Sequence, residues 1–185
     1  MATCLRFNTT IASSCRSEQP GVVTAYLANY SDLVSYTLST AGSLVSGMTF
    51  SGATGTDKAF YRISFNKQVA SALDTPEISL PNGTSVSKPK ISGFVQGMTE
   101  EVYNMYKQLL QADVICIFKT IDAKYYAVGL QNGLSMIAGS YGTVAESNGR
   151  KGLTFELEGL ESLPMVELDP AAGGLASTFI TNYVV

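Results

Sequence analysis

Short runs of β-branched and aromatic residues recur along this chain, separated by clusters of Gly, Asn, Pro and Ser. Branched and aromatic side chains fit the pleated surface of a sheet, whereas the separating residues favour turns. The pattern predicts a mainly β fold, a β-sandwich or a partly closed barrel. The strands expected from it are Val22–Ala28, Leu44–Phe50, Ala59–Phe65, Lys88–Val95, Val114–Phe118, Tyr125–Leu130 and Leu153–Glu158.

Two of these strands carry enough pattern to predict which faces are buried. Val114–Phe118 is a continuous apolar run, which is typical of a strand covered on both faces. Leu153–Glu158 alternates strictly, so that Leu153, Phe155 and Leu157 are expected to face the core and the residues between them to face outward.

Turn signals divide the strands from one another. Asn132-Gly133 and Asn148-Gly149 predict hairpin turns, because Asn and Gly tolerate the positive φ that tight turns require. Asp74–Thr84 contains two prolines and is expected to be a loop, since proline cannot donate to a strand ladder. Ser51–Asp57, with the sequence SGATGTD, is expected to be a second loop.

One segment, residues 99–111, has helical periodicity. Its apolar residues recur at spacings of three and four and form one stripe, made of Val102, Met105, Tyr106, Leu109 and Leu110. Thr99 is expected to cap the first turn, where Glu100 and Glu101 oppose the positive end of the helix dipole. The sequence thus predicts a single helix that flanks the β structure with its apolar face toward the core.

The composition excludes several classes of protein. Hydrophobic residues make up 45% of the 185-residue chain and charged residues only 15%, which favours a surface that contacts other protein. The net charge is −3 and provides no basic footprint for nucleic acid. No apolar run approaches a membrane span, and residues 1–14 lack the apolar stretch of a signal peptide, so folding in the cytoplasm of the producing cell is expected.

Catalytic and metal-binding patterns are missing from the sequence. The chain has no histidine, which removes the commonest general base and the commonest metal ligand. Its three cysteines are an odd number and form no metal knuckle: Cys116 is expected in the core, and Cys4 and Cys15 carry no assigned role. The SxxK sequences at Ser64–Lys67, Ser85–Lys88 and Ser87–Lys90 lie in strand or turn patterns rather than at a helix start. We therefore expect no enzymatic activity and no cofactor.

Two acidic residues on one strand, Glu156 and Glu158, project from the same face, about 7 Å apart by strand geometry. Such a spacing resembles that of glycosidase carboxylates, but a solvated strand face is the favoured explanation, because this alternation is routine in sheets with one exposed face.

The order of segments from the helix onward resembles a group of structural proteins from phages of Bacteroidetes. The likeness is carried by Lys124–Leu134 (KYYAVGLQNGL), the Gly-rich Ala138–Thr143, and Asn148–Gly159 (NGRKGLTFELEG) followed by a segment ending at Pro164. At the N-terminus, Met1–Cys4, Cys15-Arg16 and Gly21–Tyr26 are also similar to that group. The Pro-rich Asp74–Thr84 and the residues after Pro170 depart from its pattern.

This resemblance implies a tail-tube-like virion protein that assembles with copies of itself into sixfold rings, in which strands of adjacent subunits form a continuous sheet. The other partners it implies are tail or head–tail proteins, with DNA only as passing cargo and no membrane. Its place would be the virion tail, after synthesis in the host bacterial cytoplasm. Glu156 and Glu158 are then candidates to line a lumen, where acidic groups would repel DNA; the alternative is an outer solvated face.

The last residues form a distinct part of the sequence. We expect one β-rich domain over residues 1–169 and a C-terminal extension over 170–185, in which Pro170 is followed by Ala-Ala-Gly-Gly. Its uncharged, β-prone residues Thr178, Phe179, Ile180, Tyr183 and Val184 are candidates for an arm that docks on a neighbouring subunit. The alternative is that this segment folds back on its own domain as a last strand.

A second function, from another class, is a monomeric carbohydrate- or ligand-binding β-sandwich. Aromatic faces stack on sugars, and the chain has ten tyrosines, but it has no tryptophan and the tyrosines are scattered in the sequence.

Overall fold

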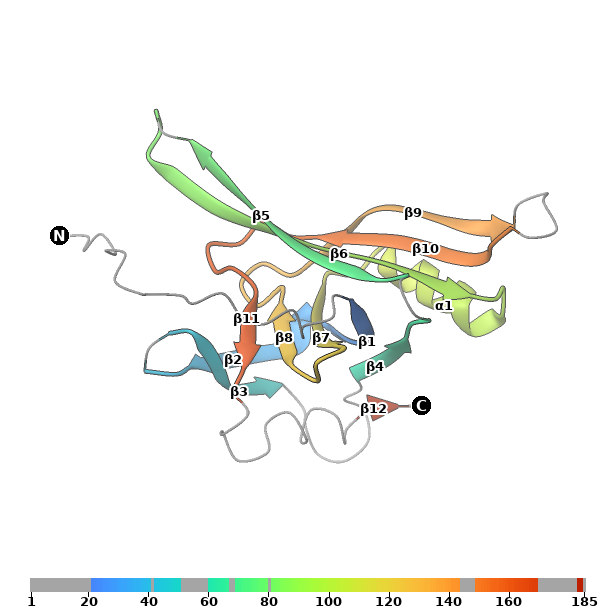
Figure 1. Ribbon diagram of the computed structural model, residues 1–185, viewed down its shortest axis with the longest axis horizontal. Helices are drawn as coiled ribbons and strands as arrows, with labels where there is room; N and C mark the ends of the chain where they lie inside the picture. The colour runs from blue at the N-terminus through green and yellow to red at the C-terminus, as the bar shows by residue number, and fades with distance from the viewer. Residues whose placement is uncertain are drawn as a thin grey trace.

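The residues that the structure describes form twelve strands in two sheets, with one α-helix beside them (Figure 1). A computed structural model describes residues 21–40, 42–50, 60–66, 69–79, 81–143 and 149–169, together with the backbone of 183–184. Neither sheet closes into a barrel within these residues, so the fold is mainly β and sandwich-like, as the sequence predicts.

The larger sheet has the strand order β12-β4-β1-β7-β8-β11-β3-β2. Its strands are β1 (Val22–Asn29), β2 (Leu33–Leu38), β3 (Leu44–Phe50), β4 (Phe60–Ser64), β7 (Val114–Thr120), β8 (Tyr125–Val128), β11 (Val166–Leu168) and β12 (Tyr183–Val184). The central strand β7 is buried on both faces, since Val114 to Phe118 are all buried, which confirms the prediction for this run. Two core clusters therefore cover the two faces of this sheet.

The smaller sheet has the order β5-β6-β10-β9 and packs over one face of the larger one (Figure 1). Its strands are β5 (Ser71–Ser79), β6 (Thr84–Gln96), β9 (Ser135–Thr143) and β10 (Lys151–Glu158). Leu153, Phe155 and Leu157 are each fully buried between the sheets, so the predicted alternation of β10 is confirmed. In Figure 1 the β5–β6 hairpin extends well beyond the rest of the fold.

The helix α1 (Glu100–Leu109) has nearly the predicted bounds and the predicted cap. The Thr99 hydroxyl accepts a hydrogen bond from the Val102 N–H at 3.4 Å. Leu109 is buried, and Val102, Met105 and Tyr106 of the predicted stripe pack on the core between the sheets. Leu110, the last residue of the stripe, is 56% exposed, so the prediction is wrong for this residue. The rings of Tyr106 and Tyr141, whose centroids lie 5.8 Å apart, stack the helix against β9.

The predicted loop at Asp74–Thr84 is wrong, because β5 runs through Pro76 to Ser79 and pairs with β6 in a hairpin whose turn includes residues 81–83. Pro76 lies opposite Ser87 on β6. The N–H and C=O of Ser87 bond the backbone of Glu161 on the other side of β6, at 2.7 and 2.9 Å. Since β5 is an edge strand and this pair needs no ladder bond, proline fits without losing one.

The remaining turns and loops predicted from the sequence differ in outcome. The hairpin predicted at Asn132-Gly133 is wrong, because these residues connect β8 of the larger sheet to β9 of the smaller one. Gly133 has the positive φ of +77° that the pattern predicts, and Tyr30 packs against it. The hairpin predicted around Asn148-Gly149 is confirmed by the antiparallel β9–β10 pair, although Asn148 lies outside the described residues. The expected loop Ser51–Asp57 also lies outside them, as do Cys4 and Cys15 and most of the extension 170–185.

Candidate functional site

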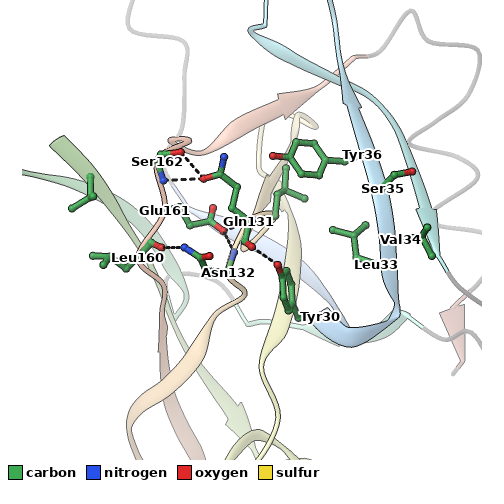
Figure 2. Close-up of a pocket in the computed structure, with 12 residues that line it drawn as sticks. Tyr30, Leu33, Val34, Ser35, Tyr36, Gln131, Asn132, Leu160, Glu161 and Ser162 are labelled. Carbon is green, nitrogen blue, oxygen red and sulfur yellow. Dashed lines mark hydrogen bonds between the residues drawn. The ribbon is translucent and has the colours of Figure 1, made fainter. Parts of the chain in front are cut away.

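A groove of about 710 Å³ lies beside β2, where the two sheets meet at one end of the fold (Figure 2). One wall is four consecutive residues of the edge strand β2, from Leu33 to Tyr36. The opposite wall comes from the connection between β8 and β9, at residues 130–132, and from the segment 160–162 that follows β10. The groove combines apolar walls with a few polar groups, which is the usual make-up of a binding site.

Gln131 is the polar residue that the surroundings hold most firmly. Its backbone N–H donates to Glu161 Oε1 at 2.8 Å, and its backbone C=O accepts from the Tyr30 hydroxyl. Its side-chain Oε1 accepts from both the N–H and the hydroxyl of Ser162, at 2.9 and 2.8 Å (Figure 2). The amide oxygen is thus used, whereas the Nε2 donors bond no acceptor among the described residues. A fixed amide with unused donors is preorganised to bind a carbonyl or hydroxyl oxygen.

Glu161 forms the floor of this arrangement and is only 2% exposed. Its carboxylate accepts three backbone hydrogen bonds, from Gln131 at 2.8 Å, Asn132 at 3.3 Å and Gly129 at 3.3 Å. Burial raises the pKa of the Glu161 carboxyl above its ordinary value, and the charge of Asp74 adds to this, while the three N–H groups act against it. Because both oxygens are occupied by backbone donors, Glu161 shapes the groove and offers it no free charge.

Asp74 connects the small sheet to the same region. It accepts hydrogen bonds from the Ser87 hydroxyl and, at 2.9 Å, from the Met165 N–H. Through these contacts and those of Glu161, segment 161–165 joins β6 to the β8–β9 connection. Sequence reasoning missed both carboxylates, and no local pattern singles them out, because their partners lie up to 91 residues away.

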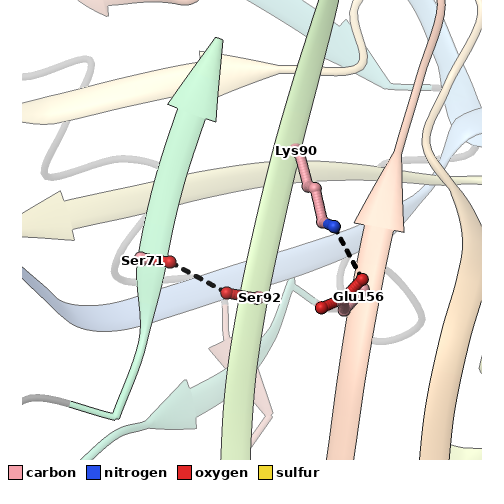
Figure 3. Close-up of polar contacts among 4 residues, drawn as sticks. All are labelled: Ser71, Lys90, Ser92 and Glu156. Carbon is pink, nitrogen blue, oxygen red and sulfur yellow. Dashed lines mark hydrogen bonds and ion pairs between the residues drawn. The ribbon is translucent and has the colours of Figure 1, made fainter. Parts of the chain in front are cut away.

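The acidic pair singled out in the sequence lies on the outer face of the small sheet. Glu156 Oε2 forms an ion pair with Lys90 Nζ at 2.7 Å, beside the hydrogen-bonded hydroxyls of Ser71 and Ser92 at 2.8 Å (Figure 3). Glu158 lies opposite Lys90 in the strand register and is half-buried. That Glu156 and Glu158 line a lumen stays a prediction. The charge of Glu156 on this face is paired with Lys90.

Two of the candidate arm residues, Tyr183 and Val184, have described backbone. They form β12, which pairs in parallel with Phe60 and Tyr61 of β4 in the same chain. In a single chain these two residues therefore pair with their own domain, as in the alternative hypothesis of a last strand. Thr178, Phe179 and Ile180 lie outside the described residues, and docking on a neighbour stays a prediction.

The groove and its surroundings contain no group of three or more metal-ligating residues, as far as the described residues go. Cys116 is fully buried, and burial raises the pKa of its thiol far above the ordinary range. None of the helices in the same part of the chain has the length and apolar character needed to cross a membrane.

Comparisons with protein-family models, with curated proteins and with solved structures find no match to this chain. The groove is a candidate interaction surface because of its lining and its preorganised amide group.

Proposed function

We propose that this chain is a structural subunit of a phage virion, which forms a tail tube or a ring of the head–tail conduit by assembly with copies of itself. The proposal combines the sequence resemblance to virion proteins with a mainly β fold whose sheets have long edges to which the described residues add no further strand. The observation that carries the proposal is that β2 and β9 are edge strands whose outer sides pair with no further strand in the described part of the chain.

Both strands have the properties that make an exposed edge prone to pairing. β2 (LVSYTL) and β9 (SMIAGSYGT) contain neither a charged residue nor a proline. Monomeric proteins usually protect such edges with charges, prolines or covering segments, because the unpaired N–H and C=O groups template another strand. A chain with only 15% charged residues and two such edges is suited to constitutive contact with other subunits.

Native mass spectrometry and negative-stain microscopy of the purified chain test this function. Rings or tubes at micromolar concentration are expected, with masses at integer multiples of 19.7 kDa. A chain that stays monomeric at all concentrations, including in the presence of the other tail proteins of its phage, would contradict the proposal.

The groove favours a second candidate function, the carbohydrate-binding module. Tyr30 and Tyr36, two of the tyrosines scattered along the sequence, both line it beside the free amide donors of Gln131 (Figure 2). An aromatic face next to uncharged amide and hydroxyl groups suits a neutral sugar. Isothermal titration with neutral oligosaccharides, using the Gln131→Ala variant as control, distinguishes this function. A monomer that binds a glycan with measurable heat, and loses it in the variant, supports the second candidate over the first.

A further inference from the structure

The four sheet edges of the fold differ in how well they could accept another strand. The outer edge of β5 carries Pro76 at a position whose backbone faces away from β6, so the proline interrupts a ladder there. The described part of β12 covers two residues, Tyr183–Val184, and offers a short edge. β2 and β9, of six and nine residues, have neither limitation. They are the two edges at which strand addition is chemically simplest.

Each of these two edges also carries a bulge with an exposed apolar residue. On β2 the pairing with β3 skips Val34, and on β9 the pairing with β10 skips Ile137. Val34 is 64% exposed and Ile137 is 52% exposed. A bulge re-aims a side chain, and here both bulges leave an aliphatic side chain in solvent at an uncharged edge.

The groove beside β2 provides a place for such a side chain. Val34 belongs to its lining, as does Leu160, which is 50% exposed on the opposite wall. Glu161 is the only charged residue among the lining residues, and its carboxylate oxygens are occupied by backbone N–H groups. The groove therefore fits an uncharged segment, because a buried charge would find no partner there. The free Nε2 donors of Gln131 suit a backbone carbonyl of that segment.

We propose that β9 of one copy of this chain adds to the outer edge of β2 of the next copy, with Ile137 entering the groove beside Val34. The occupant is a second copy because β9 is an uncharged strand with an exposed aliphatic residue, and its outer edge bears no further strand among the described residues, which suits the uncharged groove. This inference rests on the proposed self-assembly and names the surfaces that carry it. Since the two surfaces differ, the contact is head-to-tail, and repeated addition closes a ring or extends a helical tube.

Cross-linking of single-cysteine variants tests the contact directly. Cys4 and Cys15 are replaced by serine in all variants, and the buried Cys116 is kept. Ser35→Cys on β2 is mixed with Ala138→Cys on β9, both next to the bulges, and treated with a short bismaleimide under assembly conditions. We expect a dimer band in the mixture that exceeds that of either variant alone.

The matched control replaces the β9 variant by Thr75→Cys, which is exposed on the small sheet's other edge strand, β5. This mixture should give at most the background seen with single variants. A dimer yield with Thr75→Cys equal to or above that with Ala138→Cys would overturn the proposal, as would the absence of any β2–β9 product from a wild-type-like assembly.

A charge placed at the edge provides an independent measurement. Val34→Lys and Ile137→Lys should each raise the concentration at half-assembly at least tenfold, because a lysine cannot enter an uncharged contact without desolvation. Ile78→Lys, at a residue on β5 that is 62% exposed, should change it less than twofold. All three variants should melt like the wild type. The reverse order of effects overturns the proposed contact while leaving self-assembly intact, whereas a wild-type chain that never assembles refutes the proposed function itself.

Discussion

Removal of the Glu161 carboxylate should strongly destabilise the fold. In Glu161→Ala the backbone N–H groups of Gly129, Gln131 and Asn132 lose their acceptor, and the strongest of the three bonds is 2.8 Å long. A hydrogen bond to a charged group contributes about 1.5–3 kcal/mol, and each buried N–H left unpaired costs about 1–3 kcal/mol. Water from the adjacent groove can reach part of this site, and the desolvation cost of the carboxylate disappears. We therefore expect a net loss of about 2–4 kcal/mol in the free energy of unfolding.

The Glu161→Gln variant is the matched control. It keeps the size of the side chain and one acceptor oxygen, but it turns an NH₂ group toward one of the backbone donors. We expect it to lose about half as much stability as Glu161→Ala, in line with the cost of one unsatisfied pair, about 1–2 kcal/mol.

Urea unfolding followed by far-UV circular dichroism measures both variants, because the chain has no tryptophan for fluorescence. The slope of the free energy against urea should stay unchanged, since the surface exposed on unfolding is the same. A loss below about 0.5 kcal/mol in Glu161→Ala would refute the reasoning, because it would mean that water replaces the carboxylate without cost.

Three further predictions concern other contacts. The pKa of the Glu161 carboxyl is raised above its ordinary value of 4.5, so the folded state holds this proton more tightly than the unfolded state does. As the pH rises through the folded pKa, the wild type should therefore lose stability relative to Glu161→Gln. Urea unfolding of both proteins between pH 4 and 7 measures this difference. The ion pair of Lys90 and Glu156 is about one-third exposed on both sides, so a double-mutant cycle with Lys90→Ala and Glu156→Ala should give a coupling of about 0.2–1 kcal/mol that shrinks in high salt. Gly93→Ala should lower the free energy of unfolding by about 1–3 kcal/mol, because its Cβ would lie 2.6 Å from the Phe65 ring; an unchanged thermal midpoint would show that this ring moves aside freely.

The elements that could be predicted from the sequence are those whose signals are local. The spacing of apolar residues and the Thr99 cap define α1, because a helix is stabilised by residues three and four positions apart. The alternation of β10 and the apolar run of β7 define which of their faces are buried, because a strand exposes its side chains with a period of two. These patterns were sufficient for the fold class.

Features that depend on distant partners could be seen only in the packed chain. Pro76 predicts a loop locally, but it lies in a strand because Ser87 opposite it bonds Glu161 instead. The groove exists because segments around residues 33, 131 and 161 meet there, and no short pattern encodes that meeting. The role of Glu161 is likewise fixed by three backbone N–H groups about 30 residues earlier in the chain. Local sequence sets backbone preference over a few residues, whereas a buried carboxylate and a free sheet edge are defined only when the whole chain has packed.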